Sequence, residues 1–171
     1  MRLSVRELAL CAVLSALAMG LGWMESFLPA APGIPGIRLG LANTATVFAL
    51  YALGPVQALC ILFVRCTLGS VFAGNLNALV FSLLGGFAAM GTMILLSRWE
   101  KLSIYGVSIG GAAAHNCGQV AAAVLVLGSA APLYYLPVLL GVSLATGSLT
   151  GLVCARLFHA LEHAGILTQN A

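Results

Sequence analysis

Apolar runs long enough to cross a lipid bilayer recur along this chain, and they constrain its fold more than any other feature. Of its 171 residues, 61% are hydrophobic and only 6% are charged, which gives a mean hydropathy of +1.09. A soluble domain of this size needs more charge at its surface, whereas a membrane-spanning helix needs about 20 apolar residues. The sequence therefore predicts an all-α integral membrane protein with a single domain over residues 1–171.

Six apolar segments could serve as spans, and Gly54-Pro55 and Ala131-Pro132 mark breaks between them because proline interrupts a helix. We expect spans at residues 8–28, 40–53, 56–73, 76–97, 103–128 and 132–157. The second is short by this measure, and a start in the preceding loop near Gly36 would lengthen it. The first is interpreted as a retained helix and not a signal peptide, since its apolar stretch reaches Leu28 and further spans follow. The fold expected is a six-helix bundle.

The basic residues predict the orientation of this bundle. In a topology with six spans, five basic residues fall at one side of the membrane: Arg2, Arg6, Arg98, Lys101 and Arg156. Arg38 falls at the opposite side. Because basic residues gather on the cytoplasmic side, both termini are expected to be cytoplasmic.

Polar side chains inside the apolar runs indicate a binding site, since they are costly in a membrane unless they face a cavity or another helix. The segment from Gly36 to Pro55 begins with Arg38 and places Asn43 within an apolar run. The third span carries Arg65, which could snorkel to the surface, pair with a carboxylate or bind an anion. These alternatives remain open at the level of sequence.

The fifth span has the densest group of polar residues. Ser108, Ala112, His115 and Gln119 fall on one helical face, with Asn116 beside it. A buried histidine can be a structural hydrogen-bonding group, but three large polar side chains within five residues favour the lining of a site. The expected substrate-binding residues are Arg38, Asn43, Arg65, Asn77, His115, Asn116, Gln119 and Tyr135. For Asn77 the alternative is helix capping beside Asn75, and for Tyr135 it is a place in the aromatic belt.

A stripe of small residues on the first span could bring another helix close. Ala9, Ala12, Ala16 and Gly20 are spaced three and four apart on one face. This stripe could pack within the protein or dock onto a partner.

The sequence favours a binding protein over an enzyme. His159, Glu162 and His163 match the H-x-x-E-H pattern of inverted zinc peptidases, but the few residues that follow offer no further zinc ligand. The five cysteines lie in apolar runs without paired spacing, which is typical of reduced packing residues. No catalytic residue, metal or cofactor is expected, and there is no phosphate loop or nucleophile elbow.

Five segments, taken in order, resemble the bacterial family called Gx transporters, which is also labelled heptaprenyl diphosphate synthase component I. They are GIRLGLANTATVFALYALGP at 36–55, Arg65 with Leu68-Gly69, SLLGGFAAM at 82–90, AAAHNCGQ at 112–119 and YYLPVLL at 134–140. That family is similar in size and six-helix layout to the substrate-binding S components of energy-coupling-factor vitamin transporters. In those proteins a small-residue stripe on the first helix docks onto a coupling subunit, and Ala12 and Ala16 match that pattern.

The resemblance implies a substrate-binding subunit for the uptake of a small molecule of the vitamin or cofactor-precursor type, with an anion as one option. Its partners would be that substrate, the lipid bilayer and an energy-coupling membrane subunit with ATPases, without nucleic acid, in the bacterial plasma membrane. The second label implies an alternative, a non-catalytic membrane component of a heptaprenyl diphosphate synthase in isoprenoid and quinone biosynthesis. A prenyltransferase holds magnesium and diphosphate with aspartates, and this chain has none, so the chemistry would belong to a partner.

Overall fold

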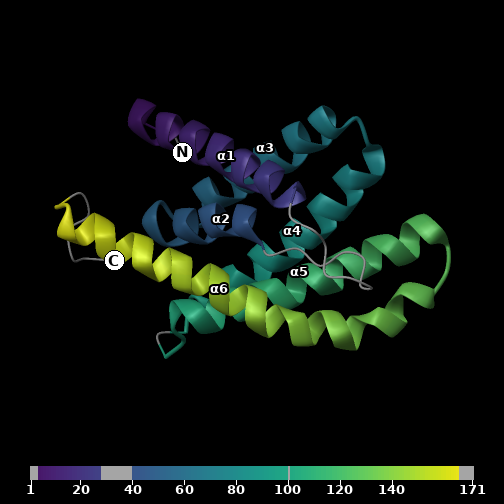
Figure 1. Ribbon diagram of the computed structural model, residues 1–171. Helices are drawn as coiled ribbons and strands as arrows, with labels where there is room; N and C mark the ends of the chain where they lie inside the picture. Colours follow the sequence, from purple (N-terminus) through teal and green to yellow (C-terminus); the bar gives the residue numbers. More distant parts are fainter. Residues whose placement is uncertain (1–3, 28–39, 100, 166–171) are drawn as a thin grey trace.

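The computed structural model describes residues 4–27, 40–99 and 101–165, and every regular element in these ranges is helical (Figure 1). The elements are α1 (Val5–Ser26), α2 (Leu41–Ala52), α3 (Pro55–Ala73), α4 (Leu76–Leu96), α5 (Ile104–Leu127), the short 3-10 helix η1 (Ala131–Tyr135) and α6 (Leu136–His163). Six α-helices therefore form where six apolar segments were expected.

The breaks between helices follow from local chemistry. Asn75 caps α4 with its side-chain oxygen, which accepts from the amides of Asn77 and Ala78. Pro55 stands at the start of α3, where its missing N–H costs nothing. The first residues of the sixth expected span, from Pro132, belong to η1, and α6 continues beyond the predicted end at residue 157 to His163.

Five of the described helical segments are long and apolar enough to cross a membrane, and α2 is the exception. Its 12 residues span about 18 Å, against about 30 Å for the hydrocarbon core of a bilayer. The expectation of a second full span over 40–53 is therefore wrong for the helix itself, which cannot cross alone. The suggested start near Gly36 lies outside the described residues.

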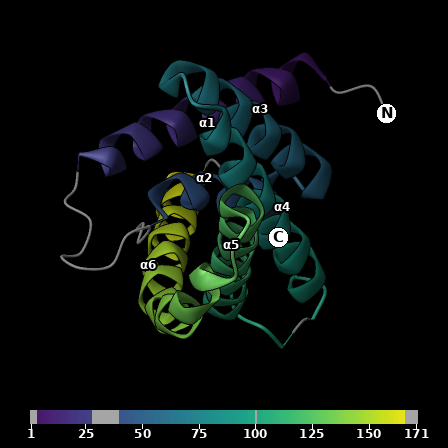
Figure 2. The same ribbon diagram turned by 90° about the vertical axis from the view of Figure 1, so that its right-hand side faces the viewer.

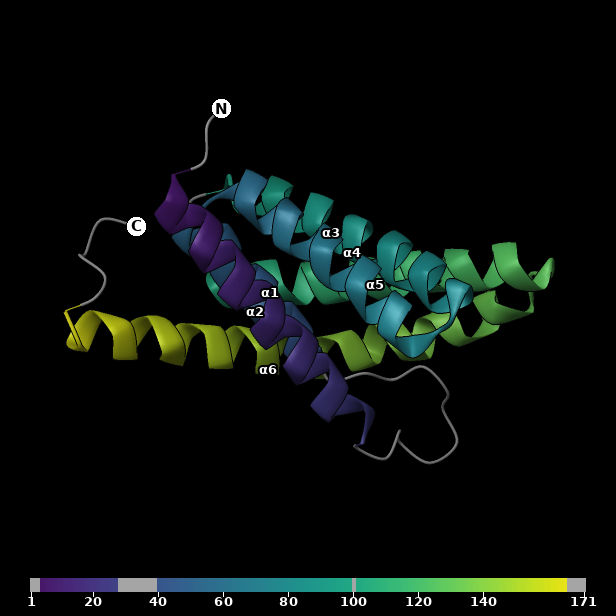
Figure 3. The same ribbon diagram turned by 90° about the horizontal axis from the view of Figure 1, so that it is seen from above.

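The helices form a bundle with α2 in its middle. Helices α3, α4, α5 and α6 run side by side, and α1 crosses them obliquely (Figure 3). Seen from its end, the bundle places α2 between α1, α3 and α6, with which it is in contact (Figure 2). The starts of α1 and α3 and the ends of α4 and α6 lie at one end of the bundle, here called the termini end (Figure 1). The opposite end is called the far end.

Glycines set the closest helix contacts. A Cβ atom added to Gly118 of α5 would lie 2.5 Å from the carbonyl oxygen of Leu84 in α4. One added to Gly147 of α6 would lie 2.5 Å from the Cα atom of Ile109 in α5. Small residues allow such backbone approach, on which helix association in lipid depends. Helices α4, α5 and α6 are therefore held side by side by close contacts between their backbones.

The largest fully buried side chains hold α2, α3, α4 and α5 together. Val47, Ile61, Leu62, Met90 and Val107 are each at most 1% exposed. This apolar cluster packs against the polar region described below and gives it a rigid boundary. Of the cysteines expected to be packing residues, Cys11, Cys66 and Cys154 are buried, whereas Cys60 and Cys117 are exposed, so the expectation is wrong for these two.

Candidate functional site

The N-terminus of α2 lies inside the bundle. Gly40, its N-cap, has a φ of +80°, a left-handed conformation that glycine adopts without strain. A Cβ atom on Gly40 would lie 3.4 Å from the hydroxyl of Thr150, which stands near the middle of α6. The first amides of α2 are therefore presented at mid-length of the bundle, where they need hydrogen-bond partners.

Glu25, near the end of α1, satisfies these amides. Its Oε1 atom accepts from the Gly40 amide at 2.8 Å, and its Oε2 atom accepts from the Leu41 amide at 3.2 Å. Glu25 is 8% exposed, and its side chain lies at the N-terminal, positive end of the α2 dipole. Glu25 thereby joins α1 to the start of α2.

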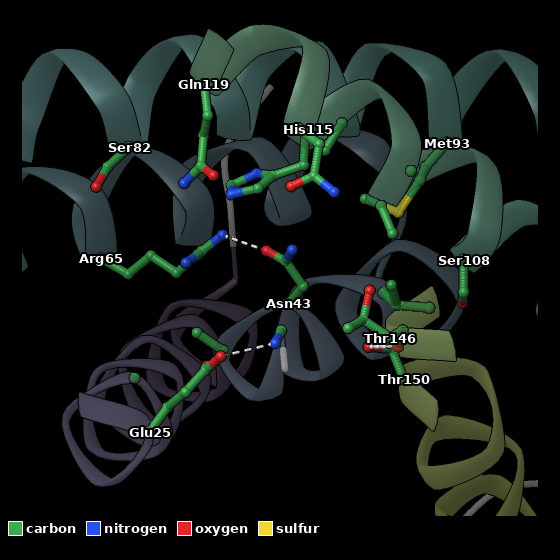
Figure 4. A pocket seen from close by; sticks show the side chains of 18 residues that line it. Glu25, Asn43, Arg65, Ser82, Met93, Ser108, His115, Gln119, Thr146 and Thr150 are labelled. Atoms are coloured by element: carbon green, nitrogen blue, oxygen red, sulfur yellow. Dashed lines mark hydrogen bonds between the residues drawn. The ribbon is translucent and has the colours of Figure 1, made fainter. Parts of the chain in front are cut away.

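Asn43 and Arg65 meet one turn further along α2. The Nη2 atom of Arg65 donates to the Oδ1 atom of Asn43 at 2.7 Å (Figure 4). Arg65 comes from α3 and extends toward α2 in the interior of the bundle, so its side chain lies beside the other polar groups of the site. A guanidinium has five N–H donors, which makes it suited to groups rich in acceptor oxygens.

Helix α5 contributes His115, Asn116 and Gln119. His115 and Gln119 lie against Gly85 of α4, where an added Cβ would be 2.9 Å from His115 Cε1 and 3.0 Å from Gln119 Cγ. Asn116 donates from Nδ2 to the Leu139 carbonyl at 2.9 Å and to the Ser143 hydroxyl at 3.0 Å. Asn116 therefore also ties α5 to α6.

These side chains line a cavity of about 70 Å³, here called the polar cavity. Its polar lining consists of Glu25, Asn43, Arg65, Ser82, Ser108, His115, Asn116, Gln119, Thr146 and Thr150 (Figure 4). The structure thus brings together five of the expected binding residues. It also confirms the predicted face of α5, since Ala112 joins Ser108, His115 and Gln119 in the lining. Ser108 is 3% exposed, and its hydroxyl has no hydrogen-bond partner among the described residues.

A second cavity of about 590 Å³, here called the apolar cavity, lies between α4, α5, η1 and the start of α6. Asn77 and Tyr135 line this cavity and not the polar one, so the expected set of binding residues divides between two places. Ser82 and Gln119 line both cavities. Arg38 lies outside the described residues.

Four polar cavity residues were not expected from the sequence: Glu25, Ser82, Thr146 and Thr150. Serine and threonine are inconspicuous in apolar helices because their hydroxyls can bond to their own backbone, as Thr150 does to the Thr146 carbonyl at 2.9 Å. The spacing of Thr146 and Thr150, four residues apart on one face, was the available signal.

The small-residue stripe of α1 faces away from the bundle. Ala9, Ala12 and Ala16 are exposed, while Cys11 and Ser15 of the same helix are buried. The sequence left two alternatives for this stripe, packing within the protein and docking onto a partner. In the described part of the chain, the stripe does not pack against another helix of the protein.

The polar cavity is suited to binding by hydrogen bonds. In the described ranges, no three His, Cys, Asp or Glu side chains lie close enough to hold a metal ion. The rings of His159 and His163 lie close together near the end of α6, with centroids 4.4 Å apart and ring planes tilted by 57°. What gathers in the polar cavity is a set of amides, hydroxyls, one carboxylate, one imidazole and one guanidinium.

The comparison with known families agrees with the sequence motifs. The family model described as heptaprenyl diphosphate synthase component I matches residues 14–157, a range that contains every residue of the polar cavity. No curated protein and no solved structure matches the chain. The match confirms the family resemblance and supports the synthase-component alternative better than the expectation of uptake. Because it covers most of the sequence, this chain belongs to the heptaprenyl diphosphate synthase component I family.

Proposed function

We propose that this protein is a membrane-embedded, non-catalytic component of a heptaprenyl diphosphate synthase, and that it binds a small molecule in the polar cavity. The observation that carries the proposal is the cavity itself, which lies among apolar helices and is lined by Asn43, Arg65, His115 and Gln119. The family description supports the assignment to a synthase.

The energetics of the membrane interior support a binding role for these residues. A polar group removed from water costs several kcal/mol unless it is hydrogen-bonded. A bundle that only needed to pack would place apolar side chains here, as it does with Val47 and Met90. The polar lining therefore favours a ligand that supplies hydrogen-bonding atoms, and the buried Ser108 hydroxyl still lacks a partner among the described residues.

The composition of the chain supports a division of labour with a catalytic partner. Prenyl transfer requires carboxylates that hold magnesium against a diphosphate, and this sequence contains no aspartate and four glutamates. Glu25, the carboxylate in the polar cavity, is bonded to the start of α2. In this proposal the partner performs the transfer, and this chain holds its ligand at the membrane.

A deletion with complementation tests the proposal. Membranes from cells that lack this chain are expected to lose heptaprenyl diphosphate formation, and the wild-type chain should restore it. Arg65→Gln should restore it poorly, because it removes the guanidinium from the polar cavity. Arg156→Gln makes the same change at an exposed position of α6 and serves as the control. Normal heptaprenyl product in the deletion strain would refute the proposal.

A second candidate function is uptake, with this chain as the substrate-binding subunit of a transporter. The exposure of Ala9, Ala12 and Ala16 favours it, since a small-residue face in lipid allows close contact with another helix. Substituting leucine for both Ala12 and Ala16 should then abolish uptake and leave ligand binding intact. Ala145→Leu, at an exposed position of α6, is the control. Uptake that survives the double substitution would remove this candidate.

A further inference from the structure

The two cavities meet at one end of the polar cavity. Ser82 of α4 and Gln119 of α5 line both. Figure 4 places these two residues beside Arg65, at the end opposite Ser108. The polar cavity thus borders, at Ser82 and Gln119, on a space several times larger.

The chemistry changes sharply across this junction. Beyond Ser82 and Gln119, the walls are mainly apolar and come from Phe81, Val120, Ala123, Leu127, Pro132 and Leu139. Asn75, Asn77 and Tyr135 add polar atoms toward the far end of the bundle. Binding sites are usually apolar with a few polar groups that fix orientation. Here the polar groups and the apolar walls lie in two adjoining compartments.

We propose that these compartments together bind one amphipathic ligand, with a compact head rich in acceptor oxygens in the polar cavity and an apolar tail in the apolar cavity. On the proposed function, on which this identification rests, the ligand is an isoprenoid diphosphate. Burial of the tail removes apolar surface from solvent, and the head meets the donors Arg65, His115 and Gln119.

Ser108 is an independent sign that the polar cavity accepts a ligand. Its side chain is 3% exposed and lines the cavity, yet its hydroxyl has no hydrogen-bond partner in the part of the chain that the structure describes. Thr146 and Thr150, on the facing helix, direct their hydroxyls to backbone carbonyls of α6. A buried hydroxyl without a partner is costly, and an oxygen of the ligand head would satisfy it.

The tail is expected to run toward the far end of the bundle. The apolar cavity extends from Ser82 and Gln119 to residues at the start of α4 and in η1, including Asn77 and Tyr135. These two residues, expected from the sequence to bind substrate, would therefore meet the end of the tail and not the head.

Binding measurements in nanodiscs of neutral phosphatidylcholine test the proposal with three probes: farnesyl diphosphate, farnesol and inorganic diphosphate. Farnesyl diphosphate should bind at least about ten-fold more tightly than either of the others, because it alone fills both compartments. Ala123→Phe should fill the apolar cavity and remove this advantage while leaving the affinity for inorganic diphosphate unchanged. Ala121→Phe, at an exposed position of the same helix, should bind like the wild type.

The outcomes separate this inference from the proposed function. Equal affinities for farnesyl diphosphate and inorganic diphosphate would overturn the tail compartment and leave a head site. Phosphatidylcholine that copurifies with the chain and is not displaced by farnesyl diphosphate would also overturn the inference, since a bilayer lipid would then be the amphipath that fits. The proposed function is decided separately, by the heptaprenyl product of the deletion strain.

Discussion

Gly85 shows how one missing side chain shapes the polar cavity. His115 and Gln119 of α5 lie against its Cα position, so close that a Cβ atom would be 2.9 Å from the imidazole and 3.0 Å from the Gln119 stem. Gly91, two turns further along α4, has no such neighbour within 4 Å. The surroundings of Gly85 therefore leave no room for a side chain, whereas those of Gly91, in the same helix, do leave room.

Gly85→Ala should displace the imidazole and the amide and weaken ligand binding by about ten-fold, since small misplacements of binding groups are costly. Gly91→Ala should leave the affinity unchanged. Each alanine also raises helix propensity by up to about 1 kcal/mol, so neither variant is expected to unfold. Titration with the ligand in nanodiscs checks both. Equal affinities in the two variants would mean that His115 and Gln119 do not contact the ligand.

At this scale the sequence predicts the conspicuous residues of the site and misses the inconspicuous ones. Asn43, Arg65, His115 and Gln119 are unusual in apolar runs, so their cost in a membrane identifies them. Glu25 could not be assigned in this way, because its role depends on α2 starting inside the bundle.

At the scale of elements, the start of α2 is held by one buried carboxylate. Glu25→Ala removes both hydrogen bonds to the Gly40 and Leu41 amides and should lower the free energy of unfolding by about 2 kcal/mol. Glu25→Gln should have a smaller effect, because its amide oxygen can still accept from one amide. Glu162→Ala, at an exposed position of α6, is the control. Thermal unfolding in detergent measures all three, and a Glu25→Ala variant as stable as the control would contradict the capping role.

The contact between α5 and α6 gives a second test at this scale. Gly147→Ala places a Cβ atom 2.5 Å from the backbone of Ile109 and should cost about 1–3 kcal/mol, more than alanine gains in helix propensity. Gly141→Ala, on the same helix with nothing within 4 Å, should be neutral or stabilising. Unfolding transitions of the two variants compared with wild type measure the difference. A Gly147→Ala variant as stable as Gly141→Ala would show that the helices can separate without cost.

The sequence predicts where the helices begin and end better than it predicts how deep each helix lies in the bundle. Long apolar runs and the proline breaks place the helices within a few residues, apart from the extension of α6. The short α2 could be recognised by length, but not its start beside the middle of α6, because that position is set by contacts with Glu25 and Thr150. Such tertiary contacts leave no periodic signal in the sequence.

At the scale of the whole molecule, the start of α1, the end of α6, the end of α4 and the start of α5 lie at the termini end (Figure 1). This arrangement suits the proposed topology, in which the basic side chains of that end face the cytoplasm. In a background without native cysteines, Lys101→Cys should resist labelling by an impermeant reagent in intact cells, and Ser129→Cys should be labelled. Labelling of the cysteine at 101 alone would reverse the orientation.

The most direct test of the central claim is native mass spectrometry of the chain released from its membrane. The account predicts a small bound molecule in the wild-type protein and in Gly91→Ala. A variant in which alanine replaces both His115 and Gln119 should lose it while remaining folded. A wild-type protein without any bound molecule, or equal occupancy in all three proteins, would contradict a ligand site in the polar cavity.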